Sequence, residues 1–283
     1  MKLLRVGAPG REVPALLLED GSLADLSPVT ADVDGPFLAG GGVERARAAL
    51  ERGQLPPLAA AGERIGPPVA RPGKVVCIGL NYRDHAAETG AAIPAEPVVF
   101  LKGSDTVIGP NDQVLVPRGS TKTDYEVELA VVLGRQARYL DGPEQAEACI
   151  AGYAVADDLS EREFQLERAG QWDKGKSCET FNPLGPWLVT PDEVGDPQRL
   201  GLRTWVNGEP RQDGSTKDMV FGVHHLVWYL SQFMLLRPGD VVNTGTPAGV
   251  ALGRPDHPYL RPGDLLEMEV DGLGRQAQRL GQA

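Results

Sequence analysis

Short β-type runs recur along most of the chain, and this pattern constrains the fold more than any other feature. Each run is rich in Val, Ile, Leu or aromatic residues, and most are bounded by Gly, Pro or Asn. Helical patterns are fewer, chiefly 143–150, 161–169 and 222–236, and they do not alternate regularly with strands, so a doubly wound parallel sheet is not expected. We predict an α+β, β-rich fold, a mixed β-roll or sandwich with a few packed helices. The predicted strands lie at 74–79, 97–102, 113–117, 125–134, 152–156, 186–190, 202–206, 240–245 and 265–272.

The N-terminal part of the chain differs from the rest. Residues 1 to about 52 are typical of short strands followed by a helix over 43–52, and residues 53–72 are rich in Pro, Gly and Ala, as in a linker. We therefore predict a small N-terminal domain plus linker over 1–65 and a larger domain over 70–283. In the larger part, Asn207-Gly208 separates two strand-like runs and predicts a hairpin.

Charge and cysteine content exclude several classes of protein. The 39 acidic and 28 basic residues give a formal charge of −11, which argues against a nucleic-acid partner. A small anionic substrate stays possible, because a bound cation reverses the local field. The three cysteines are too few for a disulfide framework or a zinc site, and the N-terminus lacks the apolar core of a signal peptide, so we expect a reduced cytoplasmic setting. The most apolar window, 219–236, contains two histidines and is interpreted as a buried helix, not a membrane span.

Two glutamates share one face of the most regular strand, TDYEVELAVVLGR. With a period of two, Tyr125 and Val127 point one way, and Glu126 and Glu128 the other. Two carboxylates one pleat repeat apart can share a hard divalent cation such as Mg²⁺, which prefers oxygen ligands. The alternative is an ordinary solvent-exposed strand face.

A second acidic pair follows the run GYAVA. Asp157 and Asp158 come directly before Ser160, which can cap a helix with Glu163 three residues later, as in a capping box. Asp158 would then lie at a strand-to-helix junction and could supply a third ligand. The alternative is that both aspartates are turn and capping residues.

The segment GLNYRDHAAETG carries a histidine beside an acid. Asn81 can cap a short helix over 82–89, on which His85 and Glu88 face the same side. Such a pair activates water, because the acid orients the imidazole ring and stabilises its protonated form. A helix this short can act as a lid that orders on substrate binding. The alternative is an exposed surface histidine.

Further segments carry lysines and a glycine loop. Lys102 ends a predicted strand, and Lys176 precedes a Pro-Gly turn; each could hold a substrate carboxylate or an enolate, although most lysines are solvated. NTGTPAGV presents backbone N–H groups around Gly245 and Thr246 that can cradle a carboxylate, and it lacks the nucleotide-binding P-loop pattern.

Taken in order, these segments resemble the fumarylacetoacetate hydrolase family. The resemblance is carried by GLNYRDHAAETG, PVVFLKGSDTVIGP, TDYEVELAVVLG, GYAVADDLSEREFQ, WDKGKSCETFNPLGPWLVT and LRPGDVVNTGTPAGVALG. It implies a mixed β-roll, a homodimer, often a small N-terminal domain, and a small oxo acid as substrate. It also implies a metal site formed by Glu126, Glu128 and Asp158 for Mg²⁺, sometimes Mn²⁺ or Ca²⁺.

The resemblance implies roles for other residues too. His85 and Glu88 match the catalytic pair of the lid, Lys102 and Lys176 match lysines near the substrate, and Thr246 matches the loop that closes the pocket. Asp124 is expected to support the metal site or to bond to backbone. Arg83, Gln171 and Trp172 are candidates for contacts with the substrate tail.

The activity implied is cleavage of a 2,4-diketo acid to pyruvate and a carboxylic acid. In this hypothesis His85, oriented by Glu88, activates the water that attacks the 4-carbonyl, and Lys102 or Lys176 balances the charge of the enolate. The segment LERAGQWDKGK is similar to that of bacterial hydrolases of 2,4-diketo-3-deoxy sugar acids; acylpyruvate is the other substrate considered. One alternative keeps the site but changes the reaction, to oxaloacetate decarboxylation or oxo-diacid isomerisation. Another is a metal-binding module without catalysis.

Overall fold

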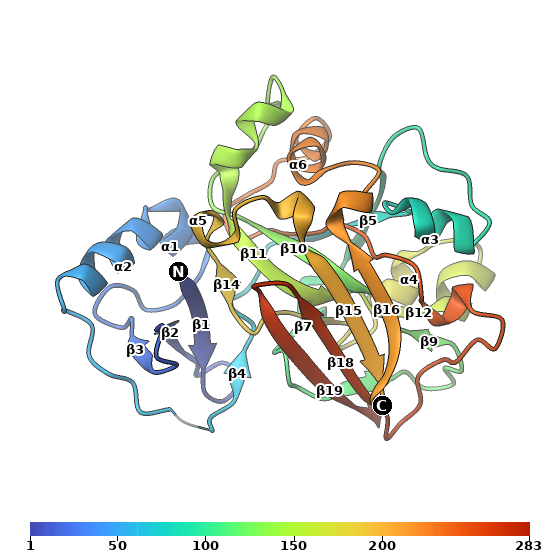
Figure 1. The fold of residues 1–283 in the computed structure, drawn as a ribbon, viewed down its shortest axis with the longest axis horizontal. Helices are drawn as coiled ribbons and strands as arrows, with labels where there is room; N and C mark the ends of the chain where they lie inside the picture. Colours follow the sequence, from blue (N-terminus) through green and yellow to red (C-terminus); the bar gives the residue numbers. More distant parts are fainter. Residues whose placement is uncertain (61) are drawn as a thin grey trace.

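The computed structural model describes residues 1–60 and 62–283. Its centre is a ten-stranded mixed sheet (Figure 1). Every predicted run contains a strand of the structure, and the β-rich α+β fold is confirmed. The order across the central sheet is β3 (Leu23–Asp25), β2 (Val13–Leu17), β1 (Lys2–Val6), β14 (Leu188–Val189), β11 (Ile150–Asp157), β10 (Val127–Leu133), β17 (Val241–Asn243), β5 (Val75–Gly79) and β6 (Val98–Lys102), with β4 (Ile65–Gly66) paired to β1.

A five-stranded sheet covers one face of this centre. Its strands β15 (Gly201–Val206) and β18 (Leu265–Val270) contact β10, and β18 and β19 (Gly274–Gln282) contact β11. Asn207 and Gly208 join two of its strands with positive φ angles of 53° and 81°, so the predicted hairpin is confirmed. The order is β16 (Glu209–Ser215), β15 (Gly201–Val206), β18 (Leu265–Val270), β19 (Gly274–Gln282) and β8 (Val114–Val116), and two-stranded sheets pair β12 (Ser160–Glu161) with β9 (Thr123–Asp124) and β13 (Asn182–Pro183) with β7 (Val107–Ile108).

Strand β10 is buried on both faces along its whole length. Leu129 and Val131 join the core between the two sheets, whereas Ala130 and Val132 pack into a second core under the N-terminal elements. Alternate side chains of β10 therefore lie in two different cores. The first residues of the strand lead into the site described below.

The N-terminal strands continue the central sheet. Strand β1 pairs with β2 and β4, and also with β14 through Lys2 opposite Val189. In Figure 1 these elements lie on the opposite side of the molecule from helix α3 (Arg83–Glu88). The division into domains over 1–65 and 70–283 stays a prediction, and residue 61 of the predicted linker lies outside the described residues.

The helices are short; one predicted helix, over 143–150, was wrong, and another, over 161–169, is confirmed only in part. Residues 143–150 form two 3₁₀ turns, Pro143–Gln145 and Glu147–Cys149, and Ile150 already belongs to β11. Only part of 161–169 is helical, as a π-helix over Glu163–Glu167. Among the described residues, no helix combines the length and apolarity that a membrane crossing requires. The α-helices are α1 (Gly35–Ala39), α2 (Gly42–Glu51), α3, α4 (Asp173–Lys176), α5 (Pro191–Val194) and α6 (Val223–Ser231); further 3₁₀ turns lie at Ser104–Thr106, Pro197–Arg199, Thr216–Asp218 and Ala251–Gly253.

Candidate metal centre and active site

The antiparallel register of β10 and β11 brings the two acidic segments together. Val127 lies opposite Asp157, so the residue before β10 and the residue after β11 are neighbours. The backbone N–H of Asp158 donates to the Glu126 carbonyl oxygen over 3.0 Å, and the Glu126 N–H donates to Asp157 Oδ1 over 3.1 Å. Asp158 is thereby fixed beside Glu126, although 32 positions separate them in sequence.

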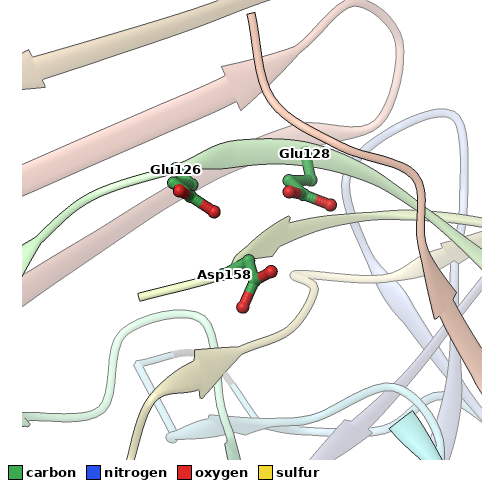
Figure 2. A group of neighbouring side chains, drawn as sticks. All are labelled: Glu126, Glu128 and Asp158. Atoms are coloured by element: carbon green, nitrogen blue, oxygen red, sulfur yellow. The ribbon is translucent and has the colours of Figure 1, made fainter. Parts of the chain in front are cut away.

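Three carboxylates converge at this point. Figure 2 shows Glu126 and Glu128 side by side where the chain enters β10, with Asp158 across from them. One oxygen from each lies within 4.8 Å of the others, and the residues are only 5%, 1% and 0% exposed. The alternative of a solvent-exposed strand face was therefore wrong.

Buried cations surround the carboxylates. Lys176 Nζ lies 2.6 Å from Glu126 Oε2 and 3.0 Å from Asp158 Oδ2. Lys102 Nζ donates to Asp158 Oδ1 and to the carbonyl oxygens of Leu159 and Phe181. Arg162 Nη2 donates to Glu126 Oε1 over 2.7 Å. Lys102 thus holds Asp158 in place, and Lys176 bridges two of the carboxylates.

The electrostatics of the cluster fit a divalent cation. Asp124, Glu126, Glu128, Asp157 and Asp158 are all buried, and the connected buried cations, Lys102, Lys176 and Arg162, are two fewer. Burial raises the pKa of Glu128 well above its usual value, and Asp158 and Glu126 add to that rise. Burial would also raise the pKa of Glu126, but Lys176 and Arg162 outweigh it and hold this pKa at about 2.

The donor atoms also fit a metal. Asp158 Oδ2 is buried and has an ion pair with Lys176 but no hydrogen bond of normal geometry, and all three side chains offer the oxygen ligands that Mg²⁺ and Mn²⁺ take. A hard divalent cation would offset the excess of buried carboxylates over buried cations.

Asp124 holds neighbouring parts of the site in place. Its carboxylate accepts hydrogen bonds from the backbone N–H groups of Ala251 and Leu252 and from Arg162 Nε. Arg162 in turn bonds Glu126, so the loop after β17 is tied to the carboxylate cluster. The expectation that Asp124 supports the site or bonds to backbone is confirmed.

The histidine–glutamate pair forms on α3. His85 Nδ1 lies 2.9 Å from Glu88 Oε1, and His85 is 7% exposed, so the alternative of an exposed surface histidine was wrong. Glu88 also accepts a hydrogen bond from the Gly249 N–H. It packs so closely on Gly253 that a Cβ there would lie 2.5 Å from its carboxyl carbon. The pair is therefore oriented from two sides.

The predicted capping residues have other roles. Asn81 does not cap α3; its side chain donates to the carbonyl oxygens of Phe221 and Thr244 and accepts from the Phe221 N–H. Ser160 does not cap a helix either, because it pairs with Asp124 in the β12–β9 ladder and donates to the Asp158 carbonyl oxygen. Asn81 thus bonds backbone groups that the tertiary fold brings near, whereas Ser160 bonds the carbonyl oxygen two residues before it.

One cavity of about 270 Å³ joins the two halves of the site. Carboxylates and cations line one part of it, His85 lines another, and apolar side chains complete the wall. The lining residues are Ile78, Gly79, Leu80, His85, Thr89, Ala91, Phe100, Glu126, Glu128, Arg162, Gln165, Leu166, Trp172, Lys176, Thr246 and Leu252.

The structure brings only some of the predicted substrate-binding residues to this cavity. Trp172 and Thr246 line it, and the Gly245 N–H donates to Glu128 Oε2 over 2.7 Å. Arg83 is exposed and donates to the carbonyl oxygens of Asp218 and Met219, and Gln171 is exposed and donates to Asp173. Neither Arg83 nor Gln171 is among the residues that line the cavity.

Sequence reasoning missed two polar residues of the site. Arg162 and Gln165 lie in the segment LSEREFQ, and both are buried and line the cavity. Arg162 Nη1 donates to Gln165 Oε1 over 3.0 Å, which fixes the amide. The predicted helix pattern gave no reason to place them in the site. The π-helix turns Gln165 inward, a feature often found at functional sites.

Comparison with known proteins agrees with this geometry. Residues 74–281 match the model of the fumarylacetoacetate (FAA) hydrolase C-terminal domain. The chain belongs to the fumarylacetoacetate hydrolase family. A Burkholderia multivorans relative, named only as a hydrolase without a substrate, is 51% identical over 98% of both chains.

Solved structures of the family span different reactions. The chain is 28% identical to maleylpyruvate hydrolase from Sphingobium sp. SYK-6, solved with manganese and pyruvate, with a TM-score of 0.81 and full coverage of both chains. It is 30% identical to 5-carboxymethyl-2-hydroxymuconate delta-isomerase from Mycobacterium smegmatis, with a TM-score of 0.79 over 100% of this chain and 99% of that one. Membership in this family indicates an enzyme, and the site residues must indicate the reaction.

Proposed function

We propose that this protein is a divalent-metal-dependent hydrolase that cleaves a 2,4-dioxo acid to pyruvate and a carboxylic acid. The observation that carries this proposal is that two carboxylates of the cluster, Glu126 and Glu128, line the same cavity as His85, which Glu88 orients. Decarboxylation needs a stabilised enolate but no activated water, so an oriented histidine favours hydrolysis over decarboxylation.

Glu126, Glu128 and Asp158 would hold the cation, with Mg²⁺ proposed and Mn²⁺ or Ca²⁺ as alternatives. The cation would act as a Lewis acid that polarises the 2-oxo carboxylate end of the substrate.

The chain's own residues provide the proton transfers. Glu88 holds His85 by Nδ1, so Nε2 is the nitrogen available to take a proton from water. The water oxygen attacks C4, the C3–C4 bond breaks, and its electron pair stays on C3, which then takes a proton to give pyruvate. Lys176 lines the cavity and can balance the developing negative charge, whereas Lys102 holds Asp158 from outside the lining.

The test is pyruvate release by chelator-stripped protein with and without added Mg²⁺. The substrates are a panel of 2,4-dioxo acids and oxaloacetate, and the second product is identified in each case. Metal-dependent release of pyruvate together with a carboxylic acid supports the proposal. Activity on oxaloacetate alone, with carbon dioxide as the second product, would replace it with a decarboxylase.

A further inference from the structure

We propose that the substrate carries an uncharged, apolar acyl tail beyond C4, and that tails ending in a carboxylate are rejected. This inference rests on the proposed function, because it assigns the cavity away from the carboxylate cluster to the acyl group of a 2,4-dioxo acid.

The burial of the lining residues orients the substrate. The acidic end of the cavity is the deep end, where the lining residues Glu128 and Lys176 are each 1% exposed. Leu166, at 43% exposed, marks the mouth, and Leu80 and Trp172 are half-buried. A dioxo acid whose 2-oxo carboxylate lies at the deep end therefore directs its acyl tail past these apolar side chains.

The wall along this path is apolar and tightly packed. The Trp172 ring meets Phe100 edge to face with centroids 5.5 Å apart. It also lies against Gly79, where a Cβ would be 2.6 Å from the indole. Next to Gly79, Leu80 has a φ of +54°, a conformation that costs energy in a residue with a Cβ and that persists only when the surroundings impose it. Leucine is thus held at the start of the lid segment, lining the cavity.

The positively charged side chains that line the cavity already bind carboxylates of the protein. Lys176 and Arg162 both bond Glu126 at the deep end, and His85 bonds Glu88. The Thr89 hydroxyl donates to backbone carbonyl oxygens of its own helix. Among the described residues that line the cavity, no lysine or arginine is therefore left for a second carboxylate.

An unpaired carboxylate in such a pocket loses its hydration without compensation, whereas an alkyl tail gains from leaving water. The second product would then be a monocarboxylic acid with an apolar chain. A reaction that supplies the substrate must accordingly deliver a 2,4-dioxo monoacid, not a dioxo diacid.

The experiment compares two substrates of equal chain length on the Mg²⁺-loaded protein. These are 2,4-dioxoheptanoate, with a propyl tail, and 2,4-dioxoheptanedioate, whose tail ends in a carboxylate. We expect kcat/KM for the monoacid to exceed that for the diacid by roughly 10²-fold or more, since one charge is left unpaired.

A variant at the mouth makes the test specific. Leu166→Lys places an ammonium beside the tail at a position exposed enough to tolerate it, and should reduce the monoacid preference roughly tenfold. Leu50→Lys adds the same charge at an exposed site (36%) on α2, outside the cavity lining, and should leave the preference unchanged.

The outcomes separate this inference from the proposed function. Cleavage of the diacid as fast as the monoacid overturns the tail assignment and leaves the hydrolase standing. If neither compound is cleaved, the hydrolase proposal fails. Titration calorimetry with the same two compounds then tests whether the pocket prefers an apolar tail. Tighter binding of the monoacid then supports the apolar pocket, and equal or tighter binding of the diacid overturns it.

Discussion

Replacing Glu128 with glutamine should change stability and metal binding in opposite directions. Glutamine keeps the size of the side chain and an oxygen that can accept from the Gly245 N–H, as Glu128 Oε2 does. It removes one negative charge from a buried cluster that has two more carboxylates than cations. Without metal, the variant should therefore be more stable than the wild type, and with metal it should lose its advantage.

The expected gain in stability follows from the proton affinity of the Glu128 carboxylate. The pKa of Glu128 is raised well above its ordinary value of 4.5, chiefly by burial, so folding favours the protonated form. A tenfold change in proton affinity corresponds to about 1.4 kcal/mol. We expect Glu128→Gln to stabilise the metal-free protein by roughly 1–3 kcal/mol near pH 8, or roughly 2–8 °C in melting temperature.

The sign of the pH dependence is fixed by the same shift. Because the folded protein binds this proton more tightly than the unfolded chain, the contribution of Glu128 to stability falls as pH rises from about 4.5 through the raised pKa. The melting temperature of the variant minus that of the wild type should therefore be near zero below that range, grow with pH and then level off.

The assay is thermal melting of chelator-treated protein over pH, followed by Mg²⁺ titration calorimetry at pH 8. Metal affinity should fall at least about 10²-fold when a charged ligand is lost. Glu161→Gln is the matched control: it is also fully buried, but it is held by Ser120 and Thr123 and is not part of the cluster. The control should not gain stability and should bind Mg²⁺ normally. A Glu128→Gln protein that behaves like the control would refute the metal site.

Other predictions test the remaining parts of the site. His85→Ala should lower kcat roughly 10²–10⁴-fold, if it is the general base, while His224→Ala on α6 should not; equal rates would exclude His85 from the proton transfer. Chelation should abolish pyruvate release and Mg²⁺ or Mn²⁺ should restore it, and activity that survives chelation would contradict a metal mechanism. Arg162→Lys keeps the charge but cannot bond Asp124 and Glu126 in the same way, so melting should show a loss of roughly 1–3 kcal/mol, whereas the exposed Arg168→Lys should change stability little.

Local patterns predicted those parts of the protein that depend on near neighbours. The β-rich class follows from the short apolar runs, and the hairpin at Asn207-Gly208 follows from residues that tolerate positive φ. His85 and Glu88 meet because three residues separate them on one helix. The roles of the site residues were predicted largely through family resemblance, since pattern alone left each one with an ordinary structural alternative.

Predictions failed where a distant segment determines the role of a polar residue. Asn81 and Ser160 have the residue types and spacing of helix caps, yet Asn81 bonds backbone groups of distant segments and Ser160 lies in a strand that pairs with Asp124. No sequence pattern indicated that Arg162 and Gln165 belong to the site, because a buried arginine and an exposed arginine cannot be told apart in a single sequence. Arg83 and Gln171 were assigned because they lie near the lid and the lysine segment in sequence. Nearness in sequence does not tell where a side chain points in the folded protein.

The sequence by itself determined the strands, the hairpin, the net negative charge and the spacing of Glu126 and Glu128 on one strand face. Only the tertiary structure decided that this face is buried, that Asp158 joins it through the β10–β11 register, and that Lys102 and Lys176 lie beside it. The physical reason is that periodicity fixes which side of a strand a residue faces, whereas the environment on that side depends on strands paired across long stretches of chain. Burial of like charges is costly in isolation, and only the assembled cluster shows what can compensate it.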